Sequence, residues 1–320
     1  MKFRSSLIAA ALLSLALAAA AQPSAAAAPA PGLTVQKVAE GVWMAEAEQG
    51  ANVGWFLVSD EVVVVDSGND AATARAVLAK IAETAGKPVK FVIVTHAHGD
   101  HAGGVPVFAA AGAQILCHEN SAAALSYVLS GGKSGATAGV VGISDRLVFF
   151  GGSRRAAVYY LGAGHTNADL IVLLPEEKVL FSGDLVVNGR LPYLQSADAD
   201  PRGWEQILIR LASLDVEKVV PGHGKVGTRQ SVGDSLAYLR KINELSTLFL
   251  QTRVPDDLYE MKLREPENRI TNVIVGPDHI ANVRAAVKLE RARLEKAAAT
   301  PTPAPAPKVT SGRPPAKKKN

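Results

Sequence analysis

Short apolar runs separated by turn residues dominate the first half of the chain and predict β-strands. The runs at 41–47, 53–59 and 61–66 have strand length and are bounded by glycine, serine or aspartate. The unbroken run Val62-Val63-Val64-Val65 is typical of a strand that is covered on both faces, and a similar run at 91–94 follows it. The pattern therefore predicts a sheet buried between other layers.

Apolar residues at helical spacing lie between and after these strands. Val77, Leu78 and Ile81 form one stripe, and Asp200 followed by Pro201 predicts a helix N-cap with proline at the first helical position. Further stripes run from Trp204 to Leu211, from Val232 to Leu239 and from Ile280 to Leu294. Strands in both halves, with helices between and after them, favour an α/β fold of two sheets packed face to face with helices outside.

The second half contains four more expected strands, at 157–161, 170–174, 178–181 and 218–220. Between the halves lies a segment rich in glycine and small residues, Ser121 to Ile143, with little periodicity. This segment fits either a mobile flap over a site or a connector that contains a helix.

The lone cysteine, Cys117, lies in an apolar run and is expected to be a buried, inert thiol.

The N-terminal end of the chain has the pattern of a secretory signal peptide. Lys2 and Arg4 precede an apolar run at 7–21, which ends in three alanines before Gln22. The run is shorter than the roughly 20 residues that a membrane-spanning helix needs. We therefore expect a signal peptide at 1–21, a linker at 22–31, a periplasmic or secreted protein, and no integral membrane span after cleavage. An uncleaved N-terminal anchor is the alternative.

The C-terminal end, residues 297–320, is rich in proline, alanine and lysine and is expected to be disordered. The formal net charge is +4, but two basic residues in the signal peptide and five in this tail leave the body at about −3. The basic charge is therefore no argument for a nucleic-acid-binding face. We expect this basic tail either to contact anionic envelope surfaces or simply to be solvated. Residues 32–296 remain as one domain that is long enough for a substantial core.

Five of the seven histidines fall into one pattern that indicates a metal site. The pattern is listed in chain order as His96, His98, Asp100, His101, His165, Asp184 and His223. Most of these residues lie just past the end of an expected strand, so their side chains can meet at the edge that neighbouring strands share. His96 and His98 are two residues apart in an extended segment, so their side chains can point the same way. Five imidazoles and two carboxylates suit two adjacent divalent ions, which can share a hydroxide that is nucleophilic near neutral pH. The alternative is a coincidental cluster of histidines in a loop.

The run H-x-H-x-D-H, followed in order by the later histidine, aspartate and histidine, resembles the metallo-β-lactamase superfamily from about residue 32 to at least 223. The resemblance implies a four-layer αββα sandwich with the metals at one edge between the sheets, here with a C-terminal helical extension. It implies a first metal bound by His96, His98 and His165, and a second bound by Asp100, His101 and His223. Asp184 would bridge the two metals or bind the second.

The resemblance also implies roles around the metals. Asp66 matches an early aspartate that supports the ligand loop by hydrogen bonding. Two Zn²⁺ ions are the expected cofactor, with Mn or Fe as alternatives. Asp100 is the candidate catalytic residue because it could also orient the nucleophile.

Other polar residues near the pattern are weaker candidates. Asn167, Arg190 and Tyr193 follow ligand-bearing strands and are candidates for substrate contact, with ordinary loop structure as the alternative. No ligand position is left for His118, for which a structural role is favoured. His279 is expected to cap a helix or lie at the surface, with an approach to the substrate cleft as the alternative.

These features predict a metal-dependent hydrolase of small molecules that attacks an ester, thioester, lactone or amide carbonyl. Many secreted β-lactamases of the family have Cys or Ser where this chain has Asp184, and a common type has Lys three residues later, where this chain has Val187. A class B β-lactamase is therefore the alternative, with Arg190 or Lys225 as possible replacements for the missing cation. A redox or binding metalloprotein that hydrolyses nothing is the alternative from another class.

Overall fold

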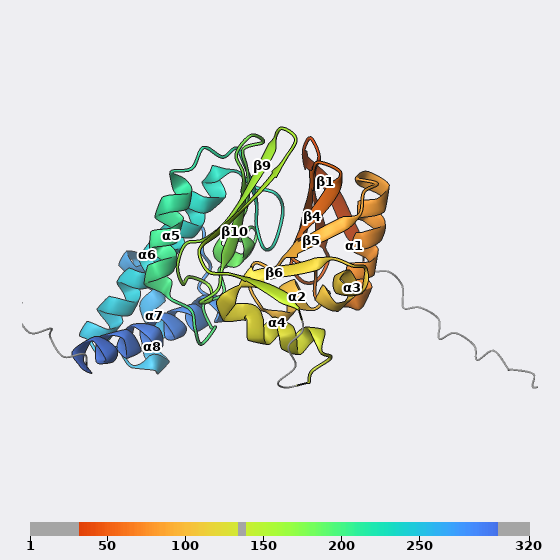
Figure 1. Ribbon diagram of the computed structural model, residues 1–320. Coiled ribbons are helices and arrows are strands. Elements are labelled where there is room, and N and C mark those ends of the chain that lie inside the picture. The colour runs from red at the N-terminus through yellow and green to blue at the C-terminus, as the bar shows by residue number, and fades with distance from the viewer. Residues whose placement is uncertain (1–31, 134–138, 300–320) are drawn as a thin grey trace, which may run out of the picture. The chain divides into compact units, whose positions relative to one another are not determined.

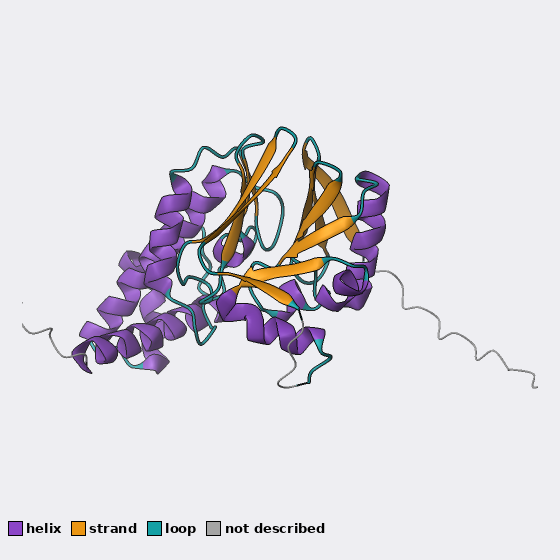
Figure 2. Ribbon diagram, viewed as in Figure 1, coloured by secondary structure: helices purple, strands orange, loops and turns teal. Residues whose placement is uncertain are grey.

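The computed structural model describes residues 32–133 and 139–299, in which two β-sheets pack face to face between two layers of helices (Figures 1 and 2). The first sheet has the order β1-β2-β3-β4-β5-β6-β7, antiparallel up to β4 and parallel from there on. Its strands are β1 (Leu33–Ala39), β2 (Val42–Ala47), β3 (Val53–Val58), β4 (Glu61–Val65), β5 (Val89–Ile93), β6 (Gln114–His118) and β7 (Val140–Ile143). The four-layer αββα arrangement expected from the sequence is confirmed.

The second sheet has the order β12-β11-β10-β9-β8, antiparallel except for the parallel pair β11 and β12. Its strands are β8 (Arg146–Gly151), β9 (Arg154–Tyr160), β10 (Leu170–Leu174), β11 (Val179–Phe181) and β12 (Lys218–Val220). The parallel pair matters for function, because both of its strands end at the same edge and deliver a ligand candidate there.

The helices fall into two groups, one outside each sheet (Figure 2). The first sheet is covered by α1 (Ala71–Thr84), α2 (Gly99–Ala102), α3 (Val105–Ala110) and α4 (Ala122–Leu129), with the 3₁₀ turn η1 (Glu119–Ser121). The second is covered by α5 (Pro201–Ala212), α6 (Arg229–Gln251), α7 (Tyr259–Arg264) and α8 (Pro277–Ala299), with the turns η2 (Gly183–Leu185), η3 (Asp256–Leu258) and η4 (Pro266–Asn268). None of the helices in the described residues has the length and apolar character of a membrane span.

Alternating side chains of the buried strands build two core layers at once. Val62 and Val64 of β4 pack against the helices, whereas Val63 and Val65 pack against the second sheet. The sheets approach closely at Gly54, where an added Cβ would lie 2.2 Å from the Phe181 ring. A side chain at position 54 would therefore push the sheets apart, and with them the two halves of any site at their common edge.

Local signals in the sequence fix several boundaries. Asp200 caps α5 as expected, because its carboxylate accepts from the N–H groups of Arg202 and Gly203 at 3.1 and 3.0 Å. Helix α8 continues to Ala299, three residues past the expected domain end at 296. The expected signal peptide, the linker to residue 31 and the tail from residue 300 lie outside the described residues.

The segment from Ser121 to Ile143 is a structured connector in its described part. Helix α4 buries Leu125 in the core, and β7 adds to the first sheet parallel to β6. Residues 134–138 of this segment lie outside the described residues. Cys117, on β6, is fully buried, and burial raises the pKa of its thiol to about 11. The expectation of a buried thiol is met.

Candidate metal centre

The residues of the histidine pattern lie beyond strand ends that meet at one edge of the two sheets. Strand β5 of the first sheet leads into the segment that carries His96 to His101. In the second sheet, His165 follows β9, Asp184 lies in η2 just after β11, and His223 follows β12. Their possible ligand atoms form three groups, each within 4.8 Å: His96, His98 and His165; His96, His101 and Asp184; and Asp100, His101 and His223.

Three imidazole nitrogens converge in the first group. Both His96 Nε2 and His165 Nε2 lie 3.0 Å from His98 Nδ1. In the third group, His223 Nε2 lies 3.1 Å and His101 Nε2 3.8 Å from Asp100 Oδ2. The two triads implied by the resemblance are therefore two of the three groups that the structure brings together.

The Asp184 carboxylate lies between the two triads. Its Oδ1 is 3.2 Å from His101 Nε2 and 3.4 Å from His223 Nε2, which belong to one triad. Its Oδ2 is 3.5 Å from His165 Nε2, which belongs to the other. One oxygen thus faces each triad, so Asp184 could contribute to an ion held by either one.

Outer hydrogen bonds orient three of these histidines. His101 Nδ1 lies 2.9 Å from Asp66 Oδ2. His165 Nδ1 lies 3.0 Å from the Tyr193 carbonyl, and His223 Nδ1 lies 2.9 Å from the Gly50 carbonyl. Because a carbonyl or carboxylate oxygen only accepts, each Nδ1 carries the proton. When the ring is neutral, each inward Nε2 has a free lone pair, the form in which histidine binds metals.

The remaining two histidines are oriented by hydroxyl groups. Thr95 Oγ1 donates to Asp66, so it accepts from His96 Nδ1 at 3.1 Å and leaves His96 Nε2 as a lone pair. Ser196 Oγ lies 2.9 Å from His98 Nε2, and a proton on that nitrogen leaves His98 Nδ1 free to face its two neighbours. No motif in the sequence points to Ser196, which lies 98 residues from its partner.

Two buried polar atoms at the centre make no hydrogen bond. They are His101 Nε2 and Asp184 Oδ1, and they face each other across 3.2 Å. A buried polar atom without a partner is costly, so such atoms usually have an ion or water that satisfies them. A cation bound between them would satisfy both, so the donor set fits divalent metals.

Asp66 supports the ligand loop from beneath. Its Oδ1 accepts from the Thr95 N–H at 2.8 Å, and its Oδ2 accepts from His101 Nδ1 at 2.9 Å. Asp66 has a φ of +64°, a conformation that non-glycine residues rarely adopt and that turns its carboxylate toward the loop. This placement agrees with the supporting role expected from the resemblance.

The carboxylates give the site a strong preference for positive charge. Burial lowers the pKa of His101, but Asp66 and Asp184 on either side outweigh it and raise this pKa well above its usual value. Burial raises the pKa of Asp184, but His101, His223 and His165 together outweigh it and hold this pKa well below its usual value. Burial lowers the pKa of His165 to about 4, so this imidazole is neutral at pH 7. A positive ion is thus favoured beside Asp184, and His165 stays free of competing protons.

Glycine at position 222 permits the close packing of the Asp184 loop. An added Cβ there would lie 1.9 Å from Asp184 Oδ1, and the Gly222 N–H donates to the Gly183 carbonyl at 2.8 Å. Gly183 itself has a φ of +51°, which favours glycine. The two glycines therefore hold Asp184 against the histidines.

The site opens into a solvent-accessible pocket of about 360 Å³. The lining comprises His98, Gly99, Asp100, His165, Asp184, Arg190, Tyr193, Ser196 and His223. Arg190 and Tyr193 thus lie at the pocket as the sequence suggested. Asn167 is absent from the lining, and its backbone bonds instead with Asn120, Tyr160 and Asp198. That arrangement is the ordinary loop structure named as its alternative.

The two remaining histidines stand apart from the metal cluster. His118 stacks on Tyr160 with ring centroids 3.8 Å apart and accepts from the Asn120 N–H, which fits the expected structural role. His279 was expected to cap a helix or lie at the surface, and this was wrong. It is 1% exposed, and its Nδ1 lies 3.1 Å from the Tyr238 hydroxyl. The packing of α8 on α6, which the local sequence does not reveal, buries it.

Comparison with known proteins places this architecture in one family. Residues 48–223 match the metallo-beta-lactamase superfamily, and this match spans more than half of the chain. The chain belongs to that superfamily.

Curated relatives include the type 2 metallo-beta-lactamases of Bacillus sp. (strain 170) and Bacillus cereus. They are 32% and 31% identical over 176 residues. Each match covers 53% of this chain, and it spans 65% and 66% of the respective relatives.

Solved structures show the same fold. A metallo-beta-lactamase from Pontibacter korlensis aligns with a TM-score of 0.57 and 26% identity, over 65% of this chain and 99% of the other. The mono-zinc form of a metallo-beta-lactamase from Pseudomonas aeruginosa aligns with a TM-score of 0.55 and 22% identity, over 67% of this chain and 97% of the other. The family segment ends at His223, and helices α6, α7 and α8 follow it in the chain.

Proposed function

We propose that the protein is a two-zinc hydrolase that cleaves an ester, thioester, lactone or amide bond of a small molecule. The observation that carries this proposal is the position of Asp184, whose two oxygens face two separate histidine-containing triads. His96, His98 and His165 would hold the first zinc ion. Asp100, His101 and His223 would hold the second, with Asp184 between them. Bound zinc ions would supply a Lewis acid and lower the pKa of a water molecule to about 7.

The chain's own residues would orient the substrate and the water. Asp100 is the carboxylate of the site with the more exposed side chain, at 36% against 7% for Asp184, and it lines the pocket. It is therefore suited to accept a hydrogen bond from the attacking water and to orient it. Arg190 lines the same pocket and makes no ion pair or hydrogen bond with any described residue, so it is suited to bind an anionic group of the substrate.

A second cavity borders the metal pocket at Arg190, on the side of helix α6. It measures about 590 Å³ and is lined by residues of α6 and by residues 269–273, and it shares Arg190 with the metal pocket. A substrate whose carbonyl lies at the metals could place the group beyond Arg190 in this cavity. Cavities of this size are typical of small-molecule sites.

A class B β-lactamase is the second candidate, because the curated relatives of about 30% identity carry that name. The site supports it less well. Val187, three residues after Asp184, is 8% exposed and pairs through its backbone with His223, so no cation stands at this position. Lys225 is absent from the lining of the metal pocket. Arg190 is therefore the cationic side chain among the residues that line this pocket.

The test is a substrate panel measured on the zinc-loaded protein. The loss of one charge-assisted contact costs roughly 1.5–3 kcal/mol, or about 10- to 150-fold. We expect low kcat/KM on penicillin, cephalosporin and carbapenem substrates, and a higher value on some ester, thioester or lactone. Lactam values near 10⁶ M⁻¹s⁻¹, which enzymes reach on their own substrates, would instead identify a β-lactamase. Iron content together with oxygen consumption would point to redox chemistry.

Export is part of the same proposal. Lys2, Arg4 and the apolar run that ends at Ala21 support cleavage and release outside the cytoplasm. N-terminal sequencing of protein from the cell envelope should begin close to Gln22. An intact Met1 terminus on cytoplasmic protein would contradict export.

A further inference from the structure

Helix α8, which follows the family segment, contacts the loop that orients two of the metal-site histidines. The loop is residues 192–196. Its Tyr193 carbonyl accepts from His165 Nδ1 at 3.0 Å, and its Ser196 hydroxyl lies 2.9 Å from His98 Nε2. Both histidines belong to the first triad. The position of this loop therefore sets the direction in which two of the three imidazoles of that triad point.

One buried side chain of α8 holds this loop. Asn282 is 2% exposed, and its Nδ2 donates to the Pro192 carbonyl at 2.7 Å. Its Oδ1 accepts from the Leu194 N–H at 3.2 Å. The Leu194 N–H belongs to the same peptide group as the Tyr193 carbonyl, and the Pro192 carbonyl belongs to the peptide group before it, so the two contacts hold the carbonyl bonded to His165 in place.

Asn282 is itself held by a buried polar pair between α6 and α8, two helices that lie side by side in Figure 1. Its second amide hydrogen donates to the Tyr238 hydroxyl at 2.9 Å. That hydroxyl in turn lies 3.1 Å from His279 Nδ1, at hydrogen-bond distance. The amide thus uses both hydrogens and its oxygen, and the reversed amide would place its oxygen against the Pro192 carbonyl. The orientation of Asn282 is therefore fixed.

We propose that Asn282 is a positioning residue for the metal centre, through which the C-terminal helices hold the loop that orients His165 and His98. This inference rests on the proposed role of these two histidines as zinc ligands. Loss of a group that orients a metal-binding histidine typically weakens metal affinity by 10- to 100-fold. Asn282 acts one contact further away, so we expect about a 10-fold loss at the first triad, at the lower end of this range.

The test compares Asn282→Ala with a matched control, Asn268→Ala. Asn268 is also buried, at 4% exposed, and its amide donates to the Lys262 carbonyl at 2.9 Å, but it contacts no residue of the metal pocket. Each variant removes the amide-to-carbonyl bond of a buried asparagine, and urea unfolding of both variants measures the loss of stability that accompanies it. Tyr238→Phe, which removes the hydroxyl that bonds both Asn282 and His279, serves as a milder variant and replaces Asn282→Ala if that variant does not fold.

Two readouts decide the outcome. One is zinc affinity, measured by competition with a chelator. The other is the exchange rate of the His165 Nδ1 proton, measured by NMR on the metal-free protein. We expect weaker zinc binding and faster proton exchange in Asn282→Ala but not in Asn268→Ala. Equal values in the two variants would overturn the proposal. If the wild-type protein bound no zinc, the proposed function would fail, whereas proton exchange would still decide whether Asn282 positions His165.

Discussion

Asp184 makes the most specific contribution of any single residue, because its two oxygens face different triads. In Asp184→Ala, the second triad should lose more zinc affinity than the first. The reason is that Oδ1 faces both His101 and His223, whereas Oδ2 faces only His165. We expect zinc content to fall from about two to about one ion per chain. Near-native circular dichroism should accompany this loss, because the residue lies beyond the end of β11.

The control for this variant is Asp60→Ala, which removes an exposed carboxylate paired with Lys87. Such surface pairs contribute little to stability, so zinc content and turnover should be unchanged. If Asp184→Ala also kept two zinc ions and full turnover, Asp184 would have no place in the metal site.

At the scale of residues, the sequence revealed the candidate metal ligands and missed the groups that orient them. The spacing of His96, His98 and Asp100 is local and can be recognised in any chain. Ser196 and Asn282 contribute one hydroxyl and one amide to partners about 90 or more residues away. Serine and asparagine at such positions look the same as in any loop or helix, so only the packed structure reveals them.

Short connections after β11 and β12 control the site at the scale of secondary-structure elements. Gly222→Ala would place a methyl group 1.9 Å from Asp184 Oδ1 as the backbone now stands, so the Asp184 loop must move away from the histidines. We expect weaker zinc binding at both triads, measured by chelator competition, with folding retained. Gly276→Ala is the matched control, because nothing lies within 4 Å of its added methyl group. Equal zinc affinity in the two variants would show that this close approach does not matter.

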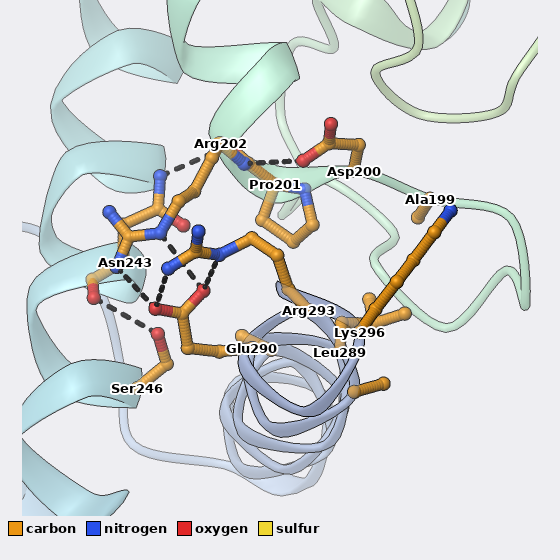
Figure 3. Close-up of a pocket in the computed structure, with 12 residues that line it drawn as sticks. Ala199, Asp200, Pro201, Arg202, Asn243, Ser246, Leu289, Glu290, Arg293 and Lys296 are labelled. Atoms are coloured by element: carbon orange, nitrogen blue, oxygen red, sulfur yellow. Dashed lines mark hydrogen bonds and ion pairs between the residues drawn. The ribbon is translucent and has the colours of Figure 1, made fainter. Parts of the chain in front are cut away.

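A buried carboxylate joins α8 to α5, as Figure 3 shows. Glu290 is 6% exposed and accepts from Arg293 and Arg202 at 2.7 to 2.9 Å. Hydrogen bonds from Arg293 and then Arg202 outweigh its desolvation and hold its pKa at about 2, against an ordinary value of 4.5. Because the pKa is lowered in the folded state, the charged form stabilises the fold above pH 4.5, and this contribution is lost as the pH falls toward 2.

The variant Glu290→Gln tests this contact through its pH dependence. At pH 7, urea unfolding of the metal-free protein should show a loss of about 1 kcal/mol, since both arginines are partly exposed to solvent. The difference from wild type should shrink between pH 4.5 and 2. Glu83→Gln, which breaks an exposed pair with Lys80, should change little at any pH. A difference for Glu290→Gln that is constant across this pH range would contradict the ionic role.

Elements with a strong local pattern were predictable from the sequence, and those that depend on distant packing were not. The valine run of β4 and the Asp200-Pro201 start of α5 carry their own signals. The environment of His279 does not, because the face of α8 that becomes buried depends on Tyr238 of α6, 41 residues earlier. The segment from Ser121 to Ile143 has weak periodicity because α4 buries only Leu125 completely.

The molecule as a whole joins a family fold to a C-terminal helical part that reaches the same site. The fold provides the edge at which seven potential ligand residues meet, and helices α6 and α8 add a cavity and the Asn282 contact. The central claim is that this edge binds two zinc ions that activity requires.

Metal analysis of the purified mature protein tests that claim most directly, combined with activity after chelation and after zinc is restored. We predict close to two zinc ions per chain, loss of activity on chelation, and recovery with added zinc. A preparation that is fully active and free of metal would contradict the account.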